Sequence, residues 1–381
     1  MIYNQGFGGG MKPKIIVTAP TGTVVTATKG TTVIIAGESG GKYVILADDY
    51  GVWTIAGTKG SQSVSQDVNV VVVDTYEVTL DFTPKVLNDA TWEQIRDVAD
   101  ASTGPNYWSV GDAKQITMNG KVSDGLTLSN YNTWVYIIGF DHNKDVEGTG
   151  IAFQGFKTAQ AGGIDVALCD SGYSDSKFSG LWFNMYNSMS NVGGWNSSRM
   201  RITTLPIVKA SLPTELTSVI KTTSIYTDNT GGGSDVPSYV TSTKDDLYLL
   251  AEFEISGTYL WSNSTENRYQ KQYAYYIAGN SKIKYRHDST SNAVIWLERS
   301  VDAKDSDSVC IMNASAQLHY GNACGDFGLS PAFKVGSNPP PPAHKRIGCW
   351  FVCVLQCKWR ENRIYYRKSR QSIRKPIRQF L

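Results

Sequence analysis

Short runs of β-branched and aromatic residues alternate with turn-forming segments over the first part of the chain. Six such runs follow one another: KIIVT, TVVTA, TTVIIA, KYVIL, VWTIAG and DVNVVVV. The segments between them, such as GESGG and TKGSQS, are typical of tight turns. This pattern predicts an all-β sandwich over residues 14–75, preceded by a glycine-rich leader at residues 1–13. Trp53 follows a turn at Gly51, and we expect its side chain on an inner face.

After residue 75 the pattern changes, and strand-like segments mix with helix-like ones. In NDATWEQIRDVADAS, Asn88 or Asp89 is expected to cap a helix. Its predicted apolar face consists of Trp92, Ile95, Val98 and Ala99. A second helix is expected in SLPTELTSVIK, with Pro213 in its first turn. Strands are predicted at YEVTLDFTP, YWSVG, KQITMNG, WVYIIGF, LYLL, VIWLERS, SVCIM and LSPAFKV. Because strands and helices do not alternate as βαβ units, residues 76–336 are predicted to form an α+β domain.

A proline run, GSNPPPPAH, closes this region, and residues 337–381 are predicted to be a proline-rich linker and a basic tail. From Lys345 onward the chain has eleven Lys and Arg residues and one acidic residue. The net charge of +2 therefore divides into +10 for the tail (11 − 1) and −8 for the rest (25 − 33). The tail could bind nucleic acid or an acidic surface, or it could be an extension without a role in folding. The acidic body indicates no specific nucleic-acid partner.

The composition is that of a folded, loop-rich β protein. Hydrophobic residues make up 41% of the chain and charged residues 18%, and the 36 glycines and 21 tyrosines favour polar loops. No apolar signal segment and no run of about 20 apolar residues is present, so we expect synthesis in the cytoplasm without membrane insertion. The six cysteines lack metal-binding spacing, and no metal or cofactor is expected. Whether Cys310 and Cys324 pair stays open, with free thiols favoured.

Nine fragments, in order, resemble one family. They are ATWEQI (90–95), YWSVGDAKQITMNG (107–120), VYIIGFDHN (135–143), FQGFKT (153–158), GGWNSSRMR (193–201), LPTELTSVIK (212–221), KDDLYLLAEFEISG (244–257), WLERS (296–300) and GLSPAFKV (328–335). This order resembles the uncharacterised domain DUF6273 over residues 88–336, a domain found in bacterial and phage proteins beside phage-tail modules. The turn in DDYGVWTI resembles the Ig-like sandwiches of phage tail and fibre proteins. The ending from WLERS to GLSPAF resembles C-type-lectin-like folds, whereas the tail departs from the family pattern.

These resemblances imply a non-enzymatic virion protein of a phage or prophage, such as a tail fibre or receptor-binding protein. The expected fold is an N-terminal Ig-like sandwich followed by an α+β domain with a C-type-lectin-like arrangement. The implied partners are other virion proteins, further copies of the chain in a homo-oligomer, and a host-surface glycan or protein. The alternatives are a purely structural decoration or fibre subunit and, less favoured, a carbohydrate-active enzyme.

Polar loops near the C-terminal strands supply the candidate recognition residues. They are Tyr285, Arg286, His287, Asp288, Asn292, Tyr320 and Asn322. Tyrosine and asparagine give contact area and adaptable hydrogen bonds, although ordinary polar loops would look the same. In GGWNSSRMR, Asn196 or Ser197 is expected to cap a helix against which Trp195 packs. Arg199 in this stretch either supports the structure or contributes to a ligand face.

The remaining acidic stretches favour structural roles. DHNKDVEGTG begins like a calcium loop, but Val146 replaces the glycine of the sharp turn and Ala152 the bidentate glutamate, so an acidic surface loop is expected, with a calcium site of another type as the less favoured alternative. Glu252 and Glu254 are predicted on one face of a strand, and a glycosidase pair there is disfavoured. In WLERS, Trp296 is expected in the core. Arg299 is expected to be buried against an acid such as Asp326.

Overall fold

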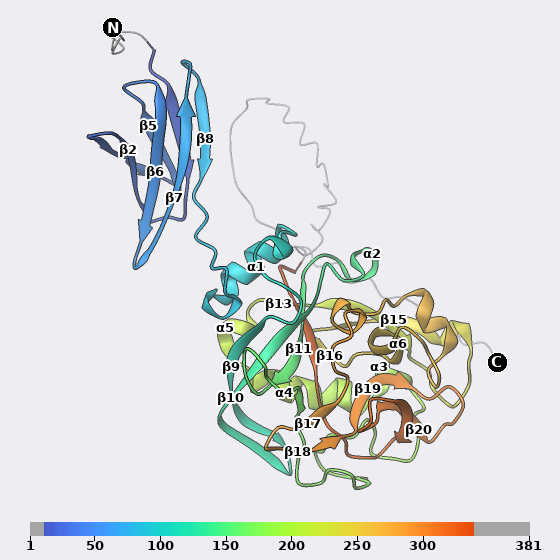
Figure 1. Cartoon of the computed structure of the whole chain (residues 1–381). Coiled ribbons are helices and arrows are strands. Elements are labelled where there is room, and N and C mark those ends of the chain that lie inside the picture. Colours follow the sequence, from blue (N-terminus) through green and yellow to red (C-terminus); the bar gives the residue numbers. More distant parts are fainter. Residues whose placement is uncertain (1–10, 339–381) are drawn as a thin grey trace, which may run out of the picture. The chain divides into compact units, whose positions relative to one another are not determined.

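The computed structural model describes residues 11–338 (Figure 1). Its N-terminal part consists of β1 (Lys14–Thr18), β2 (Val24–Lys29), β3 (Thr32–Ile35), β4 (Glu38–Ser39), β5 (Lys42–Leu46), β6 (Gly51–Lys59), β7 (Gln62–Val70) and β8 (Thr75–Thr79). They form two four-stranded sheets, with the orders β4-β5-β1-β8 and β3-β2-β6-β7. Strand β1 pairs antiparallel with β5 and parallel with β8. The leader up to residue 10 and the basic tail from residue 339 lie outside the described residues.

The alternating pattern of the first strands builds the core of this part. In β6, Trp53 and Ile55 face inward while their neighbours are more exposed. The Trp53 side chain is 1% exposed, and its Nε1 donates to the backbone oxygen of Asp49 at 2.9 Å. The sequence pattern predicts residues 76–82 as the start of the second domain, but in the structure they complete this core. Strand β8 pairs with β1, and Val78, Leu80 and Phe82 are buried in the same hydrophobic cluster.

The larger part of the chain mixes many strands with short helices. Its helical elements are η1 (Leu87–Asp89), α1 (Trp92–Asp100), η2 (Gly104–Asn106), α2 (Lys144–Glu147), α3 (Gly194–Ser197), η3 (Met200–Thr204), α4 (Leu205–Ala210), α5 (Thr214–Thr217), η4 (Pro237–Tyr239), α6 (Glu252–Ser256), η5 (Ser264–Arg268) and α7 (Ala274–Ile277). Its strands are β9 (Ala113–Ser123), β10 (Leu126–Phe140), β11 (Ile151–Lys157), β12 (Val166–Ala167), β13 (Ile220–Lys221), β14 (Thr223–Asp228), β15 (Val240–Asp245), β16 (Leu247–Tyr248), β17 (Lys284–Arg286), β18 (Ser289–Val294), β19 (Trp296–Val301), β20 (Ser308–Met312), β21 (Leu318–Asn322) and β22 (Ala332–Val335). The fold is therefore rich in β-structure.

A six-stranded antiparallel sheet forms the centre of this part. Its order is β13-β22-β11-β10-β9, and β16 also pairs with β22. Three smaller sheets, β12-β17-β18, β14-β15 and β19-β20-β21, lie beside it in the chain's larger part (Figure 1). Helix α1 packs against β11 and β22, and α4 packs against β9 and β16. One continuous hydrophobic core, with members from Leu87 to Val335, joins these elements.

The sequence predicted where these helices lie better than it predicted the residues that cap them. The apolar face of α1 is buried, but its cap is Thr91 rather than Asn88 or Asp89. The Thr91 side chain accepts from the Gln94 backbone, and the Gln94 side chain accepts in return from the Thr91 backbone, which is a capping box. The predicted strand YWSVG at 107–111 is a turn instead. Pro213 immediately precedes the single turn of α5.

The segment GGWNSSRMR forms a short helix followed by a second helical run. Gly193 and Gly194 have φ values of 98° and 52°, and a Cβ on Gly194 would lie 2.4 Å from the backbone oxygen of Asp228. Glycine is therefore needed here for both conformation and space. The predicted caps, Asn196 and Ser197, lie inside α3. The N-cap of the next run is Arg199, and the Oγ of the preceding Ser198 accepts from the Arg201 backbone N–H at 3.2 Å.

The long polar loops are tied to one another by buried side chains. Asn191 is the clearest case, because its side chain is fully buried. Its Nδ2 donates to the backbone oxygens of Asp302, Asp305 and Ser308 at 2.7–3.0 Å. Its Oδ1 accepts from the Gly232 backbone at 2.7 Å. One amide therefore joins three loops that are far apart in the sequence.

Two further predictions concern membranes and cysteines. Among residues 11–338, no helix is long and apolar enough to cross a membrane. Cys310 and Cys324 are both buried, free thiols, as is Cys169.

We predict that Asn191→Asp strongly destabilises the protein. The substitution would turn a buried donor into an acceptor that faces three carbonyl oxygens, at a cost of about 3 kcal/mol or more. Chemical denaturation of the full chain measures this loss. Asn187→Asp is the matched control, because the Asn187 side chain is exposed and its Oδ1 already accepts from Arg199. Equal effects of the two substitutions would contradict the role given to Asn191.

Candidate functional site

The predicted recognition residues fall into two hairpins. Tyr285, Arg286, His287, Asp288 and Asn292 lie in or between β17 and β18. Tyr320 and Asn322 lie on β21, which pairs with β20. Among the described residues, no hydrogen bond or ring contact connects the two groups of side chains.

Most side chains of the β17–β18 hairpin make contacts within the protein. Arg286 pairs with Asp288 at 2.9 Å. The His287 ring packs edge-to-face on Tyr131 with centroids 5.5 Å apart, and its Nδ1 accepts from the Cys169 backbone. Burial lowers the pKa of His287, which keeps the ring neutral near pH 7. These interactions fix the hairpin and leave few free groups for a ligand.

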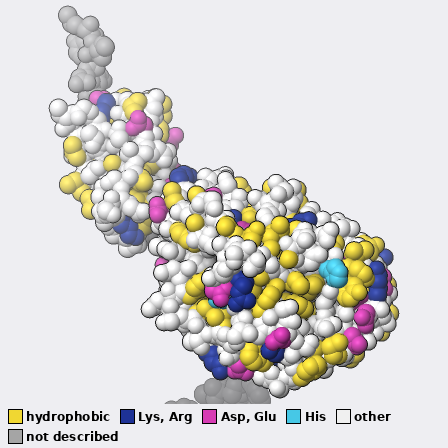
Figure 2. Space-filling model, turned by 60° about the horizontal axis from the view of Figure 1, so that its bottom comes forward, with side chains coloured by type: hydrophobic (Ala, Val, Ile, Leu, Met, Phe, Trp, Pro, Cys, Tyr) yellow, Lys and Arg dark blue, Asp and Glu magenta, His cyan; other side chains and the backbone are white. Residues whose placement is uncertain are grey.

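An aromatic cluster lies at the β20–β21 hairpin, and we name it the aromatic patch: His319 and Tyr320, which are exposed on β21, and Trp261, which is half-buried in the loop after α6. The Tyr320 side chain is 41% exposed, and its ring lies 4.6 Å from Trp261 in an edge-on contact. The His319 ring stacks beside Tyr320 at 4.9 Å. Lys304 lies over the Trp261 ring at 4.9 Å. Hydrophobic side chains gather among scattered charges on the face shown in Figure 2.

A buried carboxylate positions the loop that carries Trp261. We expected Glu252 and Glu254 on an exposed strand, but they begin helix α6 and are 0% and 1% exposed. The Glu252 carboxylate accepts from the backbone N–H groups of Leu260 and Trp261. It also accepts from the Ser262 N–H at 2.9 Å and the Ser262 hydroxyl at 2.6 Å. This carboxylate therefore anchors the loop and cannot reach a substrate at the surface.

Arg299 is buried, as the sequence suggested, but with a different partner. Both of its terminal nitrogens bond to the two carboxylate oxygens of Glu254, in a bidentate pair. Its Nη1 also donates to the Leu249 backbone oxygen at 2.9 Å. Asp326, the expected partner, lies beside Asp170 instead. Trp296 is fully buried, and its Nε1 donates to the Lys282 backbone oxygen.

The stretch DHNKDVEGTG is not the surface loop that we expected, because His142 and Glu147 are buried. Glu147 pairs with Lys334 at 2.8 Å, and the His142 ring stacks on Tyr273 at 3.6 Å. Ligand atoms of His142, Glu147 and Glu254 lie within 4.8 Å of one another, the only such group of three found in residues 11–338.

This group does not fit a metal ion. Glu147 and Glu254 already have the cations Lys334 and Arg299 as partners, so the two carboxylate charges are balanced. Burial and the charges of Lys334 and Arg299 lower the pKa of His142 to about 3. A divalent ion would add two positive charges to a closed region that holds two already. We therefore assign the cluster to the stability of the core.

Arg199 also holds the structure together. Its Nη1 donates to the Gly180 backbone oxygen at 2.7 Å, and its Nη2 donates to the Trp182 backbone oxygen at 2.8 Å. Its Nη1 additionally donates to the side-chain oxygens of Asn184 and Asn187. The guanidinium therefore supports the loop at 180–187, and little of it is left to bind a ligand.

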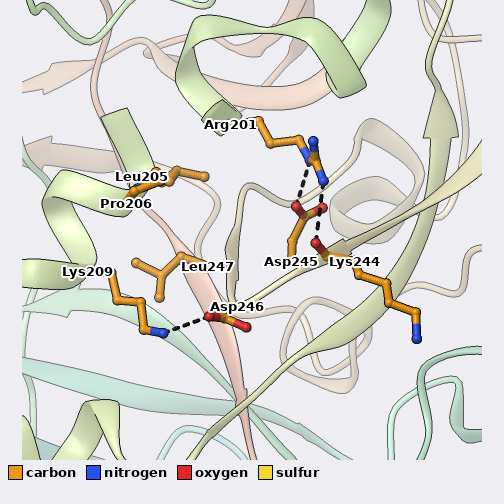
Figure 3. Close-up of a pocket in the computed structure, with 8 residues that line it drawn as sticks. All are labelled: Arg201, Leu205, Pro206, Lys209, Lys244, Asp245, Asp246 and Leu247. Atoms are coloured by element: carbon orange, nitrogen blue, oxygen red, sulfur yellow. Dashed lines mark hydrogen bonds and ion pairs between the residues drawn. The ribbon is translucent and has the colours of Figure 1, made fainter. Parts of the chain in front are cut away.

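A cavity of about 370 Å³ is lined in part by Arg201, two residues after Arg199 (Figure 3). Its walls carry three basic and two acidic side chains, but Arg201 bonds to Asp245 and Lys209 bonds to Asp246, both at 2.6 Å. Figure 3 shows the Lys244 side chain directed away from these pairs. Since the charges facing the cavity are largely paired, it offers no strong anion site.

A second cavity, of about 410 Å³, is lined by Lys157, Asp165, Tyr275 and Tyr285 among others. Behind it, buried Lys284 donates to the Tyr136 hydroxyl at 2.9 Å. The Tyr275 hydroxyl donates to Asp165, and Lys157 lies 3.6 Å from the same carboxylate. Apart from Tyr285, the members of this cluster were not predicted from the sequence, because they are spread over more than one hundred residues.

Lys284 gives this cluster a pH dependence. Burial lowers its pKa from 10.5 to about 8. Between these values the unfolded chain keeps the proton that the folded chain has released, so stability should rise with pH from about 8 to about 10.5. We predict that Lys284→Met removes this rise, as measured by urea denaturation across that range. Lys144→Met, at an exposed lysine, should keep it. A rise that persists in Lys284→Met would contradict the prediction.

The Glu252 anchor can be tested in the same way. Glu252→Gln puts an amide N–H₂ where backbone donors point, and we expect a loss of about 3 kcal/mol in the free energy of unfolding. Denaturation of the full chain measures it, with the exposed Glu215→Gln as control. A loss below about 0.5 kcal/mol in Glu252→Gln would show that the loop does not depend on this carboxylate.

Comparison with known proteins gives one match. Residues 172–337 match a family model described as "Domain of unknown function (DUF6273)". Neither the curated proteins nor the solved structures gave a match. The matched region is shorter than the expected 88–336, so the fragments at 90–158 lie before it. Its last strand, β22, nevertheless pairs with β11 outside the match. A DUF6273 domain therefore spans residues 172–337 of the chain.

Proposed function

We propose that this chain is a non-enzymatic recognition protein that binds a glycan through the aromatic patch. The observation that carries the proposal is the contact of Trp261, His319 and Tyr320 with one another, with Tyr320 41% exposed and Trp261 half-buried beneath it. Aromatic rings bury much area at a low cost in side-chain entropy, and they offer flat apolar faces next to polar edges. A sugar ring has the same mixture of apolar faces and hydroxyl edges.

The surroundings of the patch support a preformed site. The loop before Trp261 is anchored by Glu252, and Tyr320 lies on a strand paired along its length with β20. Tyr259 and Leu260, which are 42% and 47% exposed, extend the apolar surface. Lys304 adds a cation held in place by the Leu260 backbone oxygen at 2.6 Å. A rigid surface loses little entropy on binding, which favours affinity.

The acidic residues support binding rather than hydrolysis. A glycosidase needs two carboxyl groups that flank the sugar. Glu252 and Glu254 are buried and bonded to the protein, so neither can take that role. We keep the carbohydrate-active enzyme as the less favoured reading.

The biological setting remains our expectation from the sequence. In it the chain belongs to a phage or prophage virion, as a tail fibre or receptor-binding protein, and the ligand is a glycan or protein of the host surface. The N-terminal sheets would attach it to other virion proteins in a homo-oligomer. A purely structural subunit is the alternative, and it predicts no ligand at the aromatic patch.

A glycan array probed with the labelled full chain tests the proposal. We expect binding to a defined set of glycans, followed by a measurable Kd for the strongest of them. Tyr320→Ala and Trp261→Ala should each weaken that Kd about thirtyfold, corresponding to about 2 kcal/mol.

Phe178→Ala is the matched control, because Phe178 is 59% exposed but lies outside the patch. It should leave the Kd unchanged. Binding that survives both patch substitutions would move the site elsewhere. Absence of any glycan or host-cell binding would favour the purely structural subunit.

A further inference from the structure

Two buried carboxyl groups face each other where two loops run side by side. Asp170 and Asp326 are 1% and 0% exposed, and the Asp170 side chain is close enough to that of Asp326 to raise its pKa. The loops are joined around them: the Ser174 N–H donates to the Asp326 backbone oxygen at 2.7 Å, and the Asp326 N–H donates to the Asp175 backbone oxygen at 2.9 Å. The pair thus lies at a seam between residues 170–177 and 324–326.

Most of the oxygens of this pair lack a hydrogen-bond donor. Oδ1 of Asp170 accepts from the Gly172 N–H at 2.8 Å. For Oδ2 of Asp170 and both carboxylate oxygens of Asp326, no donor in the described chain makes a hydrogen bond of normal geometry. Buried polar atoms are nearly always satisfied, so three such oxygens at one point need an explanation.

The nearest basic side chains are engaged elsewhere. Lys177 bonds to Asp175 at 3.2 Å and lies over the Trp182 ring, and Arg199 bonds to the loop at 180–187. Both influence the pair through their charge alone. Neither supplies the missing donors.

We propose that Asp170 and Asp326 bind a divalent cation, preferably Ca²⁺, which joins the loop at 170–177 to the loop at 324–326. Calcium accepts oxygen ligands in flexible geometry, and carboxylates are its usual ligands. An ion between the two side chains would balance both charges and would be a partner for oxygens that lack a donor. Magnesium fits less well, because it demands regular octahedral geometry and keeps several waters.

The competing explanation is a shared proton. Burial and the neighbouring Asp170 raise the pKa of Asp326 to about 8, so without a cation the pair would hold one proton near pH 7. A single proton satisfies one donor–acceptor contact and leaves at least one buried oxygen without a partner, at a cost of about 1–3 kcal/mol. A cation would neutralise both carboxylates without the need for a proton.

Gly172 has no side chain and therefore leaves room for the carboxylates of Asp170 and Asp326. Its backbone does not require glycine, since its φ is outside the left-handed region, but an added Cβ would lie 2.6 Å from Oδ2 of Asp326 and 2.4 Å from Cε of Lys177. Glycine at this position therefore lets the carboxylate lie close against the opposite loop.

The test uses the full chain after removal of metals with EDTA. We expect calorimetric titration with CaCl₂ to show one site per chain, and saturating Ca²⁺ to raise the Tm by about 5 °C. MgCl₂ at the same concentration should have a smaller effect. Asp326→Asn and Asp170→Asn should abolish both the uptake and the shift, because each removes a charged ligand.

Asp288→Asn, at an exposed carboxylate paired with Arg286, is the control and should respond to calcium like the unmodified chain. In Asp326→Asn the new amide can donate to Asp170, so this variant should fold. If Asp326→Asn does not fold, the Asp170→Asn variant and the titration of the unmodified chain still test whether calcium binds at this pair. No calcium uptake would overturn the proposal in favour of the shared proton. Uptake unchanged in the Asp326→Asn or Asp170→Asn variant would overturn it by placing the ion elsewhere.

Discussion

A buried charge is costly unless an opposite charge lies against it, and two such buried ion pairs hold helices to strands in the larger part of this chain. Arg299 on β19 is fully buried and is held by Glu254 at the start of α6. Lys334 on β22 is equally buried and is held by Glu147 in α2. Removing one member would leave an uncompensated charge in the core, which costs about 3–5 kcal/mol. The two pairs thus fix short helices against the strands, although these helices are too short to be stable alone.

Apolar patterning predicted the strands that have one exposed face. The alternation in β1 and β6 gave both the strands and the inward position of Trp53. In WLERS the burial of Trp296 and Arg299 was predicted correctly, but alternation could not show that β19 is buried on both faces, with its polar residues inside among the apolar ones. AEFEISG likewise alternates like a strand, yet it forms α6, where Glu254 accepts from the Ala251 N–H and Gly257 ends the turn at φ 70°.

Only part of the candidate site could be predicted from the sequence. Tyr320 could be named because tyrosine in a polar hairpin is a common contact residue. Trp261 was missed, since it is 59 positions away in the chain and nothing local connects it to Tyr320. The same holds for ion pairs: the chain separates Lys334 from Glu147 by 187 residues. Such contacts follow from the topology of the sheets, which residue patterns alone do not determine.

The Glu252 carboxylate holds its loop through the backbone N–H groups of residues 260–262, together with the Ser262 hydroxyl. Backbone donors are the same for every residue type except proline. The side chains at 259–261 can therefore change without loss of their main anchor. The backbone conformation of such a loop does not depend on which side chains it carries. Natural variation or directed evolution could therefore replace the contact residues to suit a new partner while the loop keeps its conformation.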